Sequence, residues 1–290
     1  MTKLLQMIVT SIASGATYGL LALGYNLIYS TMNMAHFAQA DVMMLSGFFC
    51  LTFQGTGLPF PLCIFFSIIA TILIMFLVER LAYRPMYNAS STFLIIATMG
   101  VATVLRSGAQ LAFGTQTHGF PNIFSNKPFY FGEVALVPQN LWILGITLAL
   151  MLGLFAFMKY TKIGTAMRAI SMNRTAASLM GIRMTTVTMV AYGIAAGLAA
   201  IAGVLMSPIF KVHAYVGQNL GSKAMTASVI GGMGDARASL VGGLLLGLVD
   251  TAVSVYISTA YKDVFSFIVL LLVVMLLPQG ILGKRKVTKV

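Results

Sequence analysis

Residues 141–158 read LWILGITLALMLGLFAFM, eighteen positions without a charged side chain. An apolar run of roughly 18 or more residues is long enough to cross the hydrocarbon core of a bilayer as a helix. Comparable runs lie at 4–29, 62–82, 93–113, 187–206, 240–258 and 264–282, and shorter ones at 37–53 and 225–233. They do not alternate polar and apolar residues as barrel strands do. The sequence therefore predicts an all-α polytopic membrane protein, a bundle of about eight or nine transmembrane or half-membrane helices.

The composition excludes an ordinary soluble protein. Only 8% of the residues are charged, against about 25% in globular domains, and the mean hydropathy is +0.93. The net charge of +12 comes from 18 basic and 6 acidic residues. The basic residues cluster in a few connections between apolar runs, which is typical of cytoplasmic loops. We therefore expect contact with membrane lipid and no nucleic-acid partner.

The basic clusters also predict a topology. They lie at 79–84, at 159–183 and in the C-terminal GKRKVTKV, and all three are expected in the cytoplasm. The connection at 114–140 has one lysine and is expected outside. We predict a single transmembrane domain over 1–290, with a cytoplasmic loop at 159–186 and an external loop at 114–140. The number of spans before residue 62, and with it the side of the N-terminus, stays open.

One basic stretch, RAISMNRTAASLMGIR at 168–183, has the pattern of a short amphipathic helix. Ser171 or Asn173 suits the N-cap, because a short polar side chain there accepts a free backbone N–H. Gly181 suits a left-handed residue that ends the helix. One side of the helix would carry apolar residues spaced three or four apart: Met172, Ala176, Leu179 and Met180.

This helix has two interpretations. It could lie on anionic lipid, with its arginines at the headgroups. It could also dock into a groove of another protein. The small side chains of Ala176 and Ala177 offer lipid little apolar surface but let a protein approach closely, which favours docking.

The stretch TAASLMG at 175–181 is similar to the E-A-A-x-x-x-G loop by which ABC-transporter permeases contact their ATPase subunits. Three further blocks resemble permeases of the branched-chain (hydrophobic) amino acid importer family, the shorter of its two permease types. They are GLLALGYNLIYSTMNMAHFAQADVMMLSGF, ERLAYRPMYNASSTFLIIATMGVATVL and VIGGMGDARASLVGGLLLGLVDT. Thr175 stands where the general loop has Glu, and His36 is displaced by one position from the family's usual order.

The resemblance implies a permease subunit of a binding-protein-dependent ABC importer in the bacterial inner membrane. Its substrates would be branched-chain or other hydrophobic amino acids, with urea or short amides as an alternative. It would work with a second related permease, two ATPase subunits that bind ATP and Mg, and an extracytoplasmic binding protein. This chain itself would bind no cofactor or metal. The residues implied at the ATPase contact are Arg168, Asn173, Arg174, Ala176, Ala177, Leu179 and Gly181.

Polar residues within apolar runs are costly and become candidates for the translocation pathway. The densest group surrounds the junction of the first two runs: Asn26, Asn33, His36, Gln39 and Asp41. A broken second helix would point its N-terminus at a substrate carboxylate, and Asp41 could bind the ammonium. The interpretation that we favour is simpler, namely that this junction is a wetted cytoplasmic interface.

Other positions suggest helix packing. Thr98 and Gly100 have the character of a close-packing spot, where a neighbouring helix or a pathway could approach. Small residues four apart let helix backbones approach, as at Gly15/Gly19, Gly193/Gly197 and Gly243/Gly247. Arg106, late in its run, is expected to reach toward the outer interface. Cys50 and Cys63 flank a short connection and are expected to be two free thiols rather than a disulfide.

A second functional class is a stand-alone ion-coupled carrier or channel. Asp250 or Asp41 would then be the coupling site. For Asp250 we instead expect hydroxyl partners on neighbouring helices, or protonation. No phosphate-binding loop or G-x-S-x-G nucleophile motif occurs in the sequence. We therefore predict a transporter subunit without its own catalytic or nucleotide site.

Overall fold

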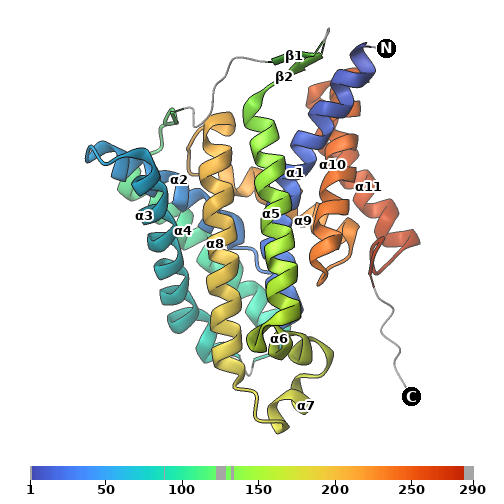
Figure 1. Cartoon of the computed structure of the whole chain (residues 1–290). Helices are drawn as coiled ribbons and strands as arrows, with labels where there is room; N and C mark the ends of the chain where they lie inside the picture. The colour runs from blue at the N-terminus through green and yellow to red at the C-terminus, as the bar shows by residue number, and fades with distance from the viewer. Residues whose placement is uncertain (1, 88, 122–128, 132–133, 284–290) are drawn as a thin grey trace. The chain divides into compact units, whose positions relative to one another are not determined.

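The long apolar runs form helices in the computed structural model, which describes residues 2–87, 89–121, 129–131 and 134–283. The helices are α1 Thr2–Met32, α2 Gln39–Gly55, α3 Phe60–Val78, α4 Ser91–Phe113, α5 Pro138–Tyr160, α6 Lys162–Met172, α7 Arg174–Leu179, α8 Met184–Phe210, α9 Val216–Gly231, α10 Ala236–Tyr256 and α11 Lys262–Leu276. Short helical turns lie at Glu79–Tyr83, Arg84–Met86 and Thr259–Tyr261. Strands β1 Phe129–Phe131 and β2 Val134–Leu136 form one antiparallel pair (Figure 1).

Seven of the described helices are long and apolar enough to cross a membrane. The protein is therefore a multi-pass α-helical membrane protein. α2 and α9 have 17 and 16 residues, which agrees with two runs predicted to be short. The predicted run at 225–233 covers only the second half of α9, because its first half carries the polar residues VGQNLGSK. The C-terminal basic cluster and part of the external loop lie outside the described residues.

Local signals explain where several helices begin and end. Pro59 precedes α3, and Pro61 lies in its first turn, where a missing N–H costs nothing. α4 ends at Gly114, whose φ of 84° is favourable for glycine. α8 tolerates Pro208 in its last turn and ends at Lys211, which has a φ of 59°. In Figure 1, α6 and α7 form the connection between the end of α5 and the start of α8.

The chain divides into two compact units. The first comprises the described residues of 1–26, 124–152 and 222–290, and the second those of 27–123 and 153–221. The prediction of one permease domain stays a prediction, since two such units can belong to one domain.

In the first unit, glycines let helices α1 and α10 pack closely against each other. A Cβ added to Gly243 on α10 would lie 2.5 Å from the Gly15 carbonyl oxygen and 2.6 Å from the Gly19 nitrogen on α1. One added to Gly247 would lie 2.5 Å from the Ser11 carbonyl oxygen. The two small-residue pairs thus face one another, and the backbones of α1 and α10 are in direct contact.

The second unit is built around α2, which packs against α3, α4 and α8. Eleven of its residues are buried, so α2 is an internal helix. Gly193 on α8 faces the Phe76 ring of α3, where an added Cβ would lie 2.8 Å from it, and Gly197 faces Ile72 at 3.7 Å. Cys50 and Cys63 are both buried and free.

Candidate functional site

The basic stretch forms parts of two helices. α6 carries Arg168 and is followed at once by α7, which has six residues. The Thr161 side chain caps α6 by accepting from the Gly164 N–H at 2.9 Å. The sequence analysis missed α6, although a threonine at this position is a recognisable N-cap. The predicted short helix is present as α7, and α6 is an additional helix before it.

α7 has defined ends. The Asn173 side chain accepts from the Ala176 N–H at 3.0 Å, so Asn173 rather than Ser171 is the cap. At the other end Gly181 has a φ of 82°, and the Ile182 N–H donates to the Ala177 carbonyl. Ala177 is 4% exposed and faces its own chain. Ala177 is thus part of the attachment of α7 rather than of its outer surface.

An apolar surface with a basic rim faces outward from this region. Met172, Leu179 and Met180 are 88%, 83% and 84% exposed. Arg168 and Arg183 are also exposed, and Arg168 donates to the Thr165 hydroxyl and to the Lys159 carbonyl. We call this set of five residues the α7 patch. Arg174 is half-buried against the Met32 sulfur and lies outside it.

The predicted pathway residues are not all brought together. Asn26 lies in the first unit, where its amide donates to the Ser239 hydroxyl at 2.6 Å and the Asp235 carbonyl at 3.2 Å. Its oxygen accepts from Ser228 and from the Gly234 N–H. Asn26 therefore links α1 to α9 and α10. His36, Gln39 and Asp41 lie in the second unit, and Asn33 is exposed with a φ of 54°.

His36 is the centre of a buried aromatic group. Its Nε2 lies 3.1 Å from the Tyr83 hydroxyl, and its ring is 5.3 Å from the rings of both Tyr83 and Tyr192. Gln39 donates to the Ala195 carbonyl at 2.8 Å. His36 and Gln39 are fully buried. A wetted interface is therefore the wrong description of these two side chains.

Asp41 forms a bidentate ion pair with Arg106 of α4. Arg106 Nε and Nη2 lie 3.1 and 3.2 Å from the two carboxylate oxygens of Asp41. Arg106 Nη1 donates to the Gln218 amide oxygen at 2.8 Å, and the guanidinium lies 5.8 Å from the centre of the Tyr215 ring. Arg106 therefore points toward α2, and its expected reach to the outer interface stays a prediction. Its spacing from Thr98, Ala102 and Ala109 places it on the face of α4 that packs inward.

Thr98 and Gly100 lie on different faces of α4. Thr98 is buried, and its hydroxyl accepts from the Phe37 N–H at 3.3 Å, which ties α4 to the start of α2. No described atom lies within 4 Å of a Cβ added to Gly100. Gly100 therefore faces away from the described chain, and no described helix packs against it.

Asp250 has a lysine partner that the sequence analysis missed. Lys223 on α9 donates to the Asp250 carboxylate and to the Ser266 hydroxyl, both at 2.8 Å. Ser266 and the Tyr18 hydroxyl also donate to Asp250, the latter at 2.8 Å. Lys223 further pairs with Asp263 at 2.8 Å. The predicted hydroxyl partners are present, and the ion pair is an addition to them.

Comparison with known proteins agrees with this architecture. The sequence model of a family described as "Branched-chain amino acid transport system / permease component" matches residues 7–274. The chain belongs to the branched-chain amino acid transport system permease family. It is 33% identical to the high-affinity branched-chain amino acid transport system permease protein LivH of Salmonella typhimurium, over 99% of this chain and 97% of LivH.

Two other relatives of this permease are similar over equal lengths. LivH of Escherichia coli K12 is 32% identical, over 99% of this chain and 97% of that protein. BraD of Pseudomonas aeruginosa, also named as a high-affinity branched-chain amino acid transport system permease protein, is 31% identical over 99% and 98%. The family is described as a permease component, so this chain is one component of a transport system that has others.

Proposed function

We propose that this permease is the membrane-spanning subunit of an ATP-driven importer of branched-chain or other hydrophobic amino acids in the bacterial inner membrane. ATP and Mg would bind to two separate ATPase subunits. A second related permease and an extracytoplasmic binding protein would complete the system. The family and its named relatives support the substrate class. The observation that carries the coupling role is the α7 patch.

The α7 patch has the properties of a protein contact. Three large apolar side chains are more than four-fifths exposed in a connection between helices, and exposed apolar patches with a polar rim mark interaction sites. Its rim is basic, and neither α6 nor α7 has an acidic residue in its first turn. An acidic, grooved surface on an ATPase subunit is the complementary partner.

The attachment of α7 suits it to transmit movement. The Asn173 cap and the left-handed Gly181 hold both ends of the helix, and buried Ala177 packs it against its own chain. A short helix held in this way moves as one body with α6 and α8. An ATPase that binds it differently in its two nucleotide states would bias the conformation of the permease.

The acidic residues offer less support to an ion-coupled carrier. Asp41 is paired with Arg106, and Asp250 is paired with Lys223. A carboxylate that relays protons or sodium has to be released from its basic partner in every cycle. The pairing of Asp250 with Lys223, together with its two hydroxyl partners, therefore favours the ATP-driven alternative.

The proposal is tested by introducing a charge into the α7 patch. Leu179→Glu and Met180→Glu should abolish co-purification of the ATPase subunits from mild-detergent membranes and lower L-leucine uptake at least tenfold. The amount and the elution volume of the permease should not change, since both side chains point outward. Gln54→Glu, which adds the same charge at the exposed end of α2, is the matched control.

Retention of the ATPase subunits and of uptake in both patch variants would contradict the docking role. If the permease instead purifies alone and transports in liposomes without ATP, the α7 patch is a lipid contact and the importer proposal is wrong.

A further inference from the structure

The Asp41–Arg106 pair lies in surroundings that a purely structural ion pair does not need. A buried ion pair contributes little net stability, and well-packed apolar residues often replace it without loss. The pair joins α2 to α4 in a membrane protein, where an arginine within a span is costly. Such residues face protein or a water-filled space and are functional candidates.

The pair is also open on one side. The Arg106 side chain is 21% exposed, while that of Asp41 is 2% exposed. Gln218 and Tyr215, which contact the free edge and the face of the guanidinium, are both exposed. The outward-facing part of the site is therefore an arginine with an amide and an aromatic ring beside it, and a carboxylate behind.

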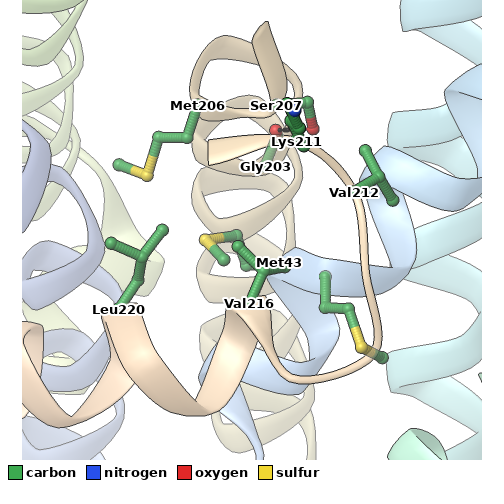
Figure 2. Close-up of a pocket in the computed structure, with 9 residues that line it drawn as sticks. Met43, Gly203, Met206, Ser207, Lys211, Val212, Val216 and Leu220 are labelled. Atoms are coloured by element: carbon green, nitrogen blue, oxygen red, sulfur yellow. Dashed lines mark hydrogen bonds between the residues drawn. The ribbon is translucent and has the colours of Figure 1, made fainter. Parts of the chain in front are cut away.

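An apolar pocket adjoins the same turn of α2. Its open space is small, about 10 Å³, and it is lined mainly by apolar side chains from α2, α8 and α9. Figure 2 shows Met206, Val216 and Leu220 around it, with Ser207 and Lys211 together at one end. A volume of that size holds about one water molecule, so a substrate side chain enters only when the side chains that line the pocket move apart.

The pair and the pocket belong to one site because α9 begins directly on α2. A Cβ added to Gly217 would lie 2.5 Å from the Ala40 carbonyl oxygen and 3.2 Å from the Asp41 Cα. Met44, which lines the pocket, is three residues beyond Asp41 and so lies on the same side of α2. Three of the lining residues are flexible methionines, which rearrange more readily than branched side chains: Met43, Met44 and Met206.

We propose that this site holds the amino acid in transit. The substrate carboxylate binds Arg106, its ammonium binds Asp41, and its branched side chain enters the methionine-walled pocket. The inference rests on the proposed import function and adds the place and the chemistry of recognition. A zwitterion replaces one ion pair by two, so no charge is left unpaired before or after binding. An amino acid with a basic side chain would place a second cation in the pocket that Lys211 already lines.

The first test separates a substrate contact from a structural pair. In the complete importer, Asp41→Asn and Arg106→Gln should each lower L-leucine uptake more than tenfold, and the double variant should stay equally low. If the pair only joins α2 to α4, the double variant, which leaves no unpaired charge, should recover uptake. The rate of ATP hydrolysis by the double variant, stimulated by the loaded binding protein, should stay within twofold of the rate of the unmodified importer.

The buried pair of the first unit provides the matched control. Lys223→Gln combined with Asp250→Asn removes an ion pair in the same way but should retain at least a third of the uptake. Recovery of uptake in the Asp41/Arg106 double variant would overturn the site. Absence of ATP-dependent L-leucine uptake in the unmodified importer would instead overturn the proposed function.

A second test does not depend on transport. Tyr215→Cys, at an exposed position beside the Arg106 guanidinium, should react with N-ethylmaleimide in the purified importer once Cys50 and Cys63 are replaced by alanine. L-leucine should slow this reaction, whereas isopentylamine and 4-methylpentanoate, which lack one of the two charges, should not. Gln54→Cys is the control for general reactivity. No slowing by L-leucine, or equal slowing by all three compounds, would overturn the site.

Discussion

Single residues fix α7 in place, and their contacts predict which substitutions act locally. Gly181 has a φ of 82°, a conformation that costs a residue with a Cβ about 1–2 kcal/mol. Gly181→Ala should therefore loosen the end of α7 and increase amide hydrogen exchange in α7. Gly153→Ala, in α5 with no described atom within 4 Å of the added Cβ, should leave exchange unchanged. Equal protection of α7 in both variants would contradict this assignment.

The N-cap makes a separate prediction. Asn173→Ala removes the acceptor for the Ala176 N–H and should destabilise the start of α7 by about 1 kcal/mol. Asn173→Asp keeps the acceptor and should behave as the unmodified chain. Faster amide exchange in the alanine variant alone is the expected result, and equal exchange in both would show that the cap contributes nothing.

At the scale of elements, the contact between α1 and α10 depends on glycine. Gly243→Val places a side chain where the α1 backbone lies 2.5 Å away. Overpacking of this kind costs about 1–3 kcal/mol or forces the helices apart. Detergent-solubilised Gly243→Val should unfold at a lower temperature than Gly145→Ala, whose added Cβ meets no described atom. Equal melting temperatures would mean that α1 and α10 do not need this close approach.

The buried lysine also acts between elements, because its network joins α1, α9, α10 and α11. Lys223→Met leaves the Asp250 carboxylate without its cation, and breaking a buried pair costs about 3–5 kcal/mol. The single variant should be poorly folded in mild detergent. Adding Asp250→Leu should restore the melting temperature toward that of the unmodified chain. A single variant as stable as the unmodified chain would show that the hydroxyl partners alone are enough to stabilise the buried Asp250 carboxylate.

At the scale of the whole molecule, the basic loops predict which side of the membrane each connection occupies. Helix α3 lies between Gln54 and the basic turn at Glu79–Tyr83, so these two should face opposite sides. In cysteine-free permease, Ser171→Cys should react with an impermeant thiol reagent only from the cytoplasm, and Gln54→Cys only from outside. Labelling of both from one side would contradict the predicted topology.

The sequence predicted the helices well because long apolar runs have few alternatives in a bilayer. It also predicted the end of α7 at Gly181 and the use of Gly15/Gly19 and Gly243/Gly247 in helix packing, since both depend on local geometry or fixed spacing. That these two pairs face each other is visible only in the structure. It missed α6 and the first half of α9, where polar residues interrupt the apolar pattern. Chain segments such as these become helical through their packing and caps rather than through hydropathy.

The amino-acid sequence by itself determined the class of protein, the basic loop at 159–183 and the family, because each rests on composition, spacing or a contiguous motif. Only the tertiary structure decided the partners of the buried charges. Arg106 lies 65 residues from Asp41, and Lys223 lies 27 residues from Asp250. An ion pair depends on the distance between atoms on different helices. The packing of the helices sets that distance, and neither helix sequence by itself contains a pattern that predicts it.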